Sequence, residues 1–288
     1  MNCFLNTLPK EPQQTFILID GSYFIFYRYY ALTTWWKNAY PDKRAELDDP
    51  TTNNVFVEKF RKTLREKVLE IPKRLKLRSD IRPIMIVGRD CSRENIWRND
   101  IYPEYKKHRT TDDSFMGGYF FRMVYEDSLF QDAGVHCVLH HPRLEADDCI
   151  AITAKKLRTM YSQSDVYIIA SDKDYVQLVE PRIHVLNLSF KKLTEQKVYT
   201  GCPRRDLFCK IVSGDASDNI PSVFPKCGIK TALKYYNNPE LFHSALQKNE
   251  EFQNRFARNK TIVDFECIPT HLVDEFLEDI EDNIIQLT

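Results

Sequence analysis

The residues of this sequence with the clearest capacity for chemistry are acidic side chains that end or follow apolar runs. Asp20 ends FILID, and Asp90 follows PIMIVGR. The other acids lie in three motifs, EADD with Glu145, Asp147 and Asp148, SDKD with Asp172 and Asp174, and GDASDN with Asp215 and Asp218. Carboxylates held close together repel one another unless cations neutralise them. Such oxygen ligands suit Mg²⁺ or Mn²⁺, and a two-metal carboxylate site is an arrangement that cleaves phosphodiester bonds.

Short apolar runs predict the strands that must place these acids. The runs are 16–20, 83–88, 135–139, 166–170 and 183–187. Helical patterns separate several of them, which predicts an α/β fold with a mostly parallel sheet and helices on both faces. Because parallel strands bring their carboxyl ends to one edge, the acids should converge there. For any single Asp, the alternative is a helix cap or a turn residue.

The other periodic segments predict helices, and the balance of elements changes along the chain. Helices are expected over 22–32, 54–78 with a break near Pro72, 119–133, and from Glu145 onward, with a loop over 37–53. After about residue 200 the strand signal ends and helical segments follow. We therefore expect a catalytic domain over 1–199 and a helical region over 200–288.

Two segments have the composition of nucleic-acid contacts. WRNDIYPEYKKHR (97–109) interleaves aromatic and basic side chains, which can grip a strand by stacking and phosphate contacts. Its candidates are Arg98, Tyr105, Lys106, Lys107 and Arg109. A solvated helix face is the alternative for the lysines. The aromatic run from Tyr23 to Trp36 can also stack on bases, although a place in the core is favoured for it.

The segment 214–236 predicts a helix that begins near Ile229. Backbone N–H groups at such an N-terminus, with a nearby lysine, can hold a phosphate whatever the base sequence. The candidates are Lys226, Gly228, Lys230 and Thr231. The alternative is a helical packing unit without a ligand.

Composition narrows the class of protein. Hydrophobic residues make up 43% of the 288 residues, which excludes a disordered chain, and the formal net charge is zero. The eight cysteines show no CxxC spacing, so zinc and redox sites are poorly supported. Neither a signal peptide nor an apolar run of about 20 residues is visible. We expect a soluble intracellular protein of the cytoplasm or nucleus, and a virus-encoded protein also fits this expectation.

The ordered motifs resemble those of the 5′-nuclease family, which includes flap endonucleases, phage enzymes of the RNase H type and the 5′-nuclease domain of DNA polymerase I. The motifs are DG (20–21), WR…YKKHR (97–109), EADD (145–148), SDKDYVQL (171–178) and GDASDNIP (214–221). The resemblance implies a three-layer PIN-like fold. It also implies a helical arch over about 92–118 and a helix–three-turn–helix element over about 203–237.

The resemblance further implies two metal sites, with Mg²⁺ as cofactor and Mn²⁺ as a substitute. The first would use Asp20, Asp90, Glu145 and Asp147, and the second Asp172, Asp174 and Asp215 with Asp218 nearby. Lys106 and Arg109 would neutralise the transferring phosphate, with Asp148 as a further catalytic residue. An arginine that contacts the scissile phosphate often stands seven residues after the first Asp; here Tyr27 holds that position, and Arg28 follows. The family's GVxGIG turn, near which a potassium ion would bind, is replaced by SVFPKCGI.

The implied activity is that of a metal-dependent 5′-3′ exonuclease or flap endonuclease in replication or repair. Its substrate would be DNA with 5′ flaps, nicks or ends, or RNA–DNA hybrids. No polymerase segment follows in this sequence, so a polymerase or sliding clamp would be a separate chain, and we expect a monomer without membrane contact. The alternatives are an RNA-cleaving PIN-type nuclease and an inactive DNA-binding scaffold. The arch and duplex-binding element argue against the first, and the complete set of carboxylates argues against the second.

Overall fold

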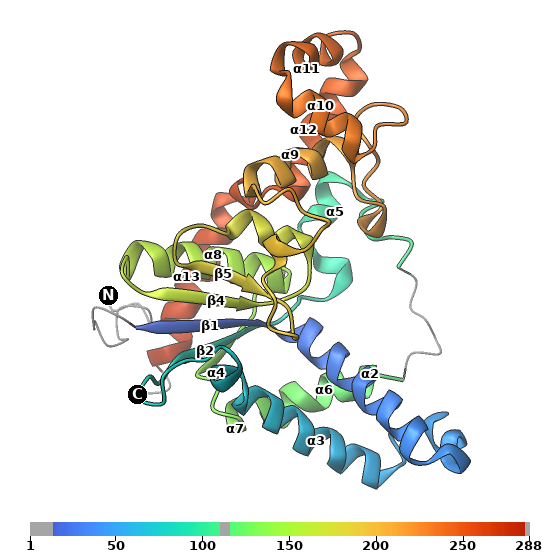
Figure 1. Ribbon diagram of the computed structural model, residues 1–288, viewed down its shortest axis with the longest axis vertical. Coiled ribbons are helices and arrows are strands. Elements are labelled where there is room, and N and C mark those ends of the chain that lie inside the picture. The colour runs from blue at the N-terminus through green and yellow to red at the C-terminus, as the bar shows by residue number, and fades with distance from the viewer. Residues whose placement is uncertain (1–13, 110–115, 286–288) are drawn as a thin grey trace.

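A computed structural model describes residues 14–109 and 116–285, with side chains described as far as Ile280. The polar stretch 110–118 of the predicted arch lies largely outside these ranges. At the centre is a parallel sheet of five strands in the order β3-β2-β1-β4-β5 (Figure 1). The strands are β1 Thr15–Asp20, β2 Ile84–Gly88, β3 Cys137–Leu139, β4 Asp165–Ile169 and β5 Ile183–Leu186. Each begins and ends within two residues of its predicted run, so the α/β prediction is confirmed.

Both faces of the sheet are covered, because successive side chains of a strand point to opposite sides. In β1, Phe16 and Leu18 pack into one core, while Ile17 and Ile19 pack into the other. The first core contains α8 (Ala146–Met160) and α13 (Thr270–Ile285). The second contains α2 (Gly21–Ala39), α3 (Asn54–Leu69), α6 (Gly118–Glu126) and α7 (Leu129–Asp132). Figure 1 shows the resulting three layers.

Two predictions of secondary structure are corrected, one of a loop and one of a helix. The predicted loop 37–53 is largely helical, since α2 runs to Ala39 and a 3-10 helix follows over Pro41–Leu47. Proline cannot continue a helix but suits the first turn of a new one, so Pro41 divides the two. The predicted helix 119–133 is split between α6 and α7 by Ser128, which has a left-handed φ of 53°. The predicted break near Pro72 is confirmed, because α3 ends at Leu69 and the short α4 covers Ile71–Arg74.

The C-terminal helices build a small core of their own at the carboxyl edge of the sheet. They are α9 Pro203–Ser213, α10 Ile229–Asn237, α11 Pro239–Leu246 and α12 Glu250–Val263. Their shared cluster contains Val212, Phe224 and Phe242. Figure 1 shows them above the sheet, while α13 returns to pack on it. Within the described ranges, none of the helices is both long and apolar enough to cross a membrane.

Candidate metal and nucleic-acid site

Five acidic side chains line a pocket of about 410 Å³ at the carboxyl edge of the sheet. They are Asp20, Asp90, Glu145, Asp147 and Asp172. Lys106 and Arg109 line the same pocket. The three aspartates lie at the ends of β1, β2 and β4. The other two acids lie at the start of α8, where Glu145 is the N-cap and Asp147 is in the first turn. The structure therefore confirms that these five acids converge at the carboxyl edge of the sheet.

Asp20 and Asp90 line the pocket and also accept hydrogen bonds from backbone N–H groups at the starts of helices. Asp20 caps α2, since its Oδ1 accepts a hydrogen bond of 2.9 Å from the backbone N–H of Tyr23. Its Oδ2 accepts a second bond of 2.9 Å from the hydroxyl of Tyr175. Asp90 accepts a bond of 2.7 Å from the backbone N–H of Ala146, which fastens the β2 loop to α8. The capping alternative therefore describes how these acids are held and does not replace the pocket.

The pocket is lined by five carboxyl groups and three basic side chains, Arg93, Lys106 and Arg109. Burial and, after it, the nearby charge of Asp90 raise the pKa of Asp20 to about 7. Burial likewise raises the pKa of Asp90. The pKa of Asp147 lies well above its usual range, because of burial and the charges of Asp148 and Glu145. A bound cation would favour the ionised form of each carboxylate.

Glu145 is the exception, because cations contact it directly. Lys106 Nζ lies 2.6 Å from its Oε1, and Arg98 Nη1 lies 3.0 Å from its Oε2. Burial acts to raise the pKa of Glu145, but these two cations outweigh it and lower the pKa. The hydroxyl of Tyr105 donates a further bond of 3.1 Å to Oε2. Glu145 is therefore held ionised and in a fixed orientation.

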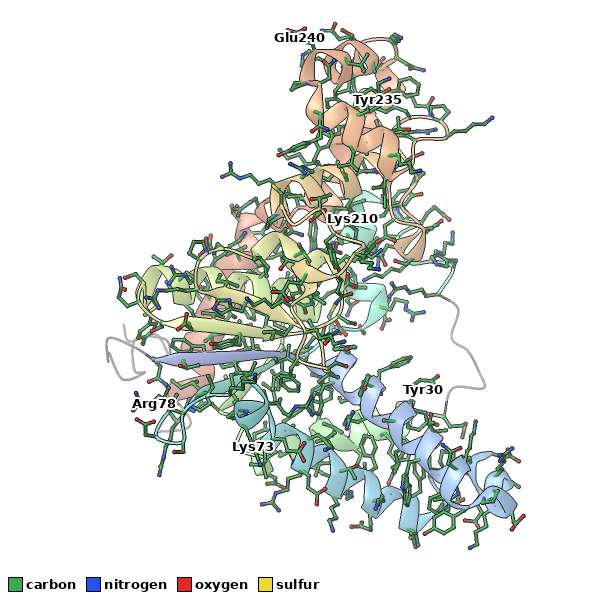
Figure 2. The ribbon with its side chains drawn as sticks, in the orientation of Figure 1. Tyr30, Lys73, Arg78, Lys210, Tyr235 and Glu240 are labelled. Carbon is green, nitrogen blue, oxygen red and sulfur yellow. The ribbon has the colours of Figure 1, made fainter. Side chains whose placement is uncertain are left out.

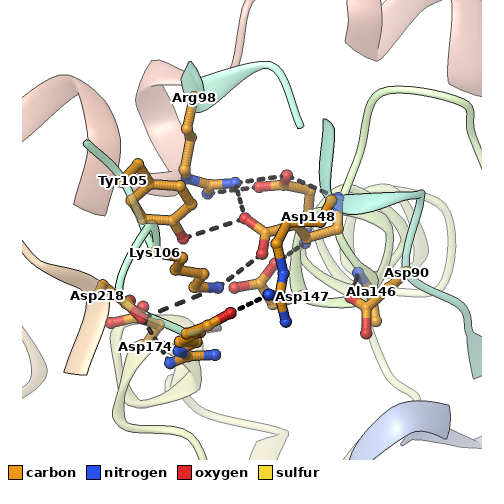
Figure 3. Close-up of polar contacts among 12 residues, drawn as sticks. Asp90, Arg98, Tyr105, Lys106, Ala146, Asp147, Asp148, Asp174 and Asp218 are labelled. Atoms are coloured by element: carbon orange, nitrogen blue, oxygen red, sulfur yellow. Dashed lines mark hydrogen bonds and ion pairs between the residues drawn. The ribbon is translucent and has the colours of Figure 1, made fainter. Parts of the chain in front are cut away.

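The prediction that Asp148 acts in catalysis is corrected. Its side chain has no exposed surface and does not line the pocket. Arg98 donates two bonds of 2.7 Å to its carboxylate (Figure 3). The indole N–H of Trp97 donates one of 2.9 Å. Its Oδ2 also accepts from the backbone N–H of Glu145, which completes a capping box at the start of α8. Asp148 thus positions α8 and makes no contact from which it could serve a substrate.

Two residues predicted to contact nucleic acid, Arg98 and Tyr105, are also buried, so this prediction is corrected as well. Arg98 is 2% exposed and Tyr105 is 5% exposed, so neither offers a surface to a strand. Besides its two acids, Arg98 binds the carbonyl oxygen of Ile262 at 2.8 Å through Nε. This guanidinium joins α5 (Arg98–Ile101), α8 and the end of α12. Its role is internal, and Figure 3 shows it above the acids with Tyr105 beside it.

A second group of acids lies beside the pocket and carries its own cation. Lys210 of α9 contacts Asp174, and its Nζ lies 2.8 Å from Asp215 Oδ2. Burial raises the pKa of Asp174 to about 6, although Lys210 offsets part of the rise. Lys210 and Ser217 outweigh burial at Asp215 and lower its pKa to about 2. Lys210 is not among the predicted site residues, and its only signal in the sequence is its place on the helix that leads into GDASDN.

Asp218 forms ion pairs with Lys106 and Arg109, the two cations predicted to neutralise the phosphate. Arg109 Nη2 lies 2.6 Å from Asp218 Oδ1, and Lys106 Nζ lies 4.0 Å from the same oxygen. Arg109 also donates to the carbonyl of Ser217 at 3.0 Å. Lys106 therefore stands between Glu145 and Asp218, and both cations are held at the rim of the pocket by acids.

The remaining predicted contacts lie on the surface, except for Arg28, which is half-buried. Lys226, Gly228, Lys230 and Thr231 are exposed at the start of α10, with Gly228 as its N-cap. Lys107 is exposed and pairs with Glu104 at 2.7 Å. The guanidinium of Arg28 lies 4.7 Å above the ring of Tyr27, on α2. The structure brings the first four together and leaves the other two apart from them.

The donor set agrees with a site for a hard cation. Glu145, Asp147 and Asp148 each offer an oxygen within 4.8 Å of the others. Because Arg98 and Trp97 occupy the oxygens of Asp148, the available oxygens are those of the pocket acids. Carboxylate oxygens without sulfur or imidazole favour Mg²⁺ or Mn²⁺ over softer metals.

Comparison with known proteins gives a consistent result. A family model described as "5'-3' exonuclease, N-terminal resolvase-like domain" matches residues 15–202. A 5′-3′ exonuclease of Buchnera aphidicola subsp. Schizaphis graminum is 34% identical over 185 residues, which are 62% of this chain and 62% of the relative. Ribonuclease H of Enterobacteria phage T4 is 26% identical over 209 residues, which are 65% of this chain and 66% of the relative. The matches thus span less than two thirds of these relatives' length.

Solved structures resemble this fold over most of the chain. The T5 5′-exonuclease with bound zinc has a TM-score of 0.61 and 18% identity, and the match covers 93% of this chain and 98% of that one. A T5 flap endonuclease in complex with DNA and metal ions also gives a TM-score of 0.61, with 16% identity and the same coverage. This likeness confirms the predicted PIN-like nuclease architecture.

Proposed function

We propose, from the premise that this chain belongs to the 5′-3′ exonuclease family, that it is a metal-dependent nuclease. It acts as a 5′-3′ exonuclease and flap endonuclease that hydrolyses phosphodiester bonds near the 5′ ends of DNA. The observation that carries the proposal is the pocket in which five carboxylates meet Lys106 and Arg109. Acids that hold cations, beside basic groups that hold a phosphate, are the elements that phosphodiester hydrolysis requires.

The cofactor in this proposal is Mg²⁺, with two ions per site and Mn²⁺ as a substitute. Asp20, Asp90, Glu145 and Asp147 would hold the first ion. Asp172, Asp174 and Asp215 would hold the second, with Asp218 beside them. Such ions supply a lowered pKa for the attacking water and stabilise the leaving oxygen.

The chain's own cations have a defined task in this reaction. Burial acts to lower the pKa of Lys106, but the charges of Glu145 and Asp218 outweigh it and hold the pKa well above its usual range. Lys106 therefore stays charged beside the pocket. Together with Arg109 it would orient the phosphate and neutralise charge that develops on it.

The start of α10 is the proposed grip on the substrate's duplex. Lys226 and Lys230 stand exposed beside the helix N-terminus, where backbone N–H groups attract an anion. Lys230→Ala should weaken binding equally for every sequence and lower the salt slope of binding by about one. Lys248→Ala, at an exposed lysine beyond α11, is the control. An unchanged salt slope in Lys230→Ala would leave α10 as a packing unit. A potassium ion would bind at the turns before α10, and stronger duplex binding in K⁺ than in Na⁺ would show it.

The deciding experiment is a cleavage assay on 5′-labelled duplexes that carry a flap, a nick or an RNA primer. We expect products close to the 5′ end with Mg²⁺ or Mn²⁺ and none with EDTA. Cleavage of single-stranded RNA alone would favour the RNA-cleaving PIN-type alternative. Binding without cleavage at any metal concentration would favour the inactive scaffold. The same assay, with a polymerase or sliding clamp added as a separate chain, tests those partners, and sedimentation tests the monomer.

A further inference from the structure

Tyr175 lines the acidic pocket, although it belongs to the chain segment that carries the neighbouring group of acids. It directly follows Asp174 in a 3-10 helix over Lys173–Leu178. Asp174 contacts Lys210, which Figure 2 shows between the sheet and the C-terminal helices. The side chain of Tyr175 is fully buried, and its hydroxyl donates a hydrogen bond of 2.9 Å to Asp20 Oδ2. One tyrosine therefore connects the two groups of carboxylates.

The two oxygens of Asp20 are held by donors from distant parts of the chain. Oδ1 accepts a bond of 2.9 Å from the backbone N–H of Tyr23, three residues away. Oδ2 accepts the bond from Tyr175, 155 residues away. A carboxylate has about four lone-pair sites, so one donor on each oxygen sets its orientation and leaves room for a cation.

Asp20 and Glu145 are held by different kinds of partner. Glu145 contacts the positive charges of Lys106 and Arg98. The two bonds to Asp20 come from neutral groups, a backbone amide and a phenol. Neutral donors orient a carboxylate and add no positive charge beside it. The arrangement around Asp20 therefore suits a carboxylate that is to meet a metal ion.

Tyr175 is itself held firmly on the side away from the pocket. The centroid of its ring lies 6.5 Å from that of Phe265. Gln177, two residues further along the same 3-10 helix, donates a bond of 3.0 Å to the carbonyl oxygen of Val263. Its side-chain oxygen accepts a bond of 2.9 Å from the backbone N–H of Phe265. These contacts fix the 3-10 helix to the end of α12, so the hydroxyl of Tyr175 is presented to Asp20 from a rigid support.

We propose that the hydroxyl of Tyr175 is a positioning group that orients Asp20 as a metal ligand. This role rests on the proposed function, because Asp20 is one of the acids that would hold the first ion. Hydrogen-bond partners of metal ligands change metal affinity by about tenfold to a hundredfold when they are removed. Tyr175→Phe keeps the ring and its packing against Phe265 and removes only the hydroxyl.

The test is calorimetric titration with Mn²⁺ in the absence of DNA. In Tyr175→Phe the tighter of two binding events should weaken about tenfold, because Asp20 loses one of its two donors. The weaker event should be unchanged even though Tyr175 adjoins Asp174, because the hydroxyl is directed to Asp20. Tyr167→Phe removes a hydroxyl from within β4 and outside the pocket, and it is the matched control. Both variants should melt within a few degrees of the unmodified protein in EDTA.

Cleavage kinetics separate a positioning role from a chemical one. The Mn²⁺ concentration that gives half the maximal rate should rise about tenfold in Tyr175→Phe. The rate at saturating Mn²⁺ should stay within about twofold of the unmodified protein, because the loss lies in metal binding and not in the transition state. Tyr167→Phe should change neither quantity.

Three results would overturn the role of Tyr175. An unchanged Mn²⁺ affinity in Tyr175→Phe would show that the hydroxyl is dispensable. Equal weakening of both binding events would show that the substitution distorts the whole segment. A rate that stays low at saturating Mn²⁺ would make the hydroxyl part of the chemistry.

The same measurements distinguish this role from the proposed function. If the unmodified protein cleaves and Tyr175→Phe binds Mn²⁺ normally, only the role of Tyr175 fails. If the unmodified protein binds Mn²⁺ in two events but cleaves no duplex, the proposed function fails, and the two affinities in Tyr175→Phe still decide the role. The absence of any Mn²⁺ binding by the unmodified protein would overturn both.

Discussion

The two groups of carboxylates at this edge of the sheet differ in what balances their charge. In the pocket, Asp20 and Asp147 face other acids, and their pKa values are raised. Beside it, Asp174 and Asp215 share the ammonium of Lys210, and the pKa of Asp215 is lowered to about 2. Beside the same lysine, the more deeply buried Asp174 keeps a raised pKa of about 6, so Asp215 alone of these four acids has a lowered pKa.

The difference indicates how each group responds to a cation. A metal that enters the pocket relieves repulsion between carboxylates and meets no ammonium bridging its aspartates. A metal at Asp174 and Asp215 must compete with Lys210. We therefore expect the pocket to bind a divalent ion more tightly than the neighbouring group does.

The largest expected effect is the loss of cleavage when a pocket ligand is removed. Asp147→Asn should lower the rate at least about a thousandfold, since metal assistance supplies several kcal/mol. Binding of DNA in EDTA should remain, because the phosphate-contacting surface is intact. Calorimetric titration with Mn²⁺ should show the tighter of two binding events in Asp174→Asn but not in Asp147→Asn. Both variants should fail to cleave. Loss of the same binding event from both variants would end the distinction between the groups.

The next effect concerns stability and contrasts two neighbouring acids. Asp148→Asn breaks a buried ion pair with Arg98 and should lower the free energy of unfolding by about 3–5 kcal/mol. Asp147→Asn removes a repelling charge and should leave the metal-free protein as stable or more stable. Urea denaturation in EDTA measures both. Equal destabilisation of the two variants would show that Asp147 is also a structural partner.

A smaller effect is expected from Lys210→Met, which takes the internal cation away. Asp174 and Asp215 then repel, so the metal-free protein should melt at a lower temperature. Millimolar Mg²⁺ should raise the melting temperature by a few degrees more in this variant than in the unmodified protein. Lys248→Met, at an exposed lysine between α11 and α12, is the control. An equal shift in all three proteins would mean that Lys210 does not compete with metal.

The smallest effect is a pH dependence of the metal-free protein. The pKa of Asp20 is about 7 in the folded state and lies at its ordinary acidic value when unfolded, so the folded state binds more protons between these values. Stability should therefore fall as pH rises from about 5 to about 7 and level off above that, with a change of a few degrees in melting temperature. Asp215, with a pKa of about 2, stays ionised throughout and adds nothing in this window. Asp174, with a pKa of about 6, adds to the same fall, so Asp20→Asn should make the slope shallower without abolishing it, while saturating Mg²⁺ should flatten it. A rise of stability with pH would contradict the raised pKa values.

The sequence by itself determined where the acids of the pocket stand. Asp20, Asp90 and Asp172 are placed by the ends of apolar runs, and parallel pairing of those strands is enough to bring them to one edge. Glu145 and Asp147 are placed by the start of a helix between two such strands. The positions of these acids depend on local patterns and on the order of strands and helices, so they can be predicted from the sequence alone.

Only the tertiary structure decided which charged groups face a ligand and which face each other. Arg98 reads as a nucleic-acid contact in sequence, yet it binds Asp148 fifty residues later and the carbonyl of Ile262, 164 residues away. Lys210 gains its role only when α9 packs beside the SDKD segment. The aromatic run on α2 divides into core and surface according to what α3 and α6 cover. Burial and long-range ion pairs depend on distances that residue types and spacing do not contain, and they set the chemistry of a charged side chain.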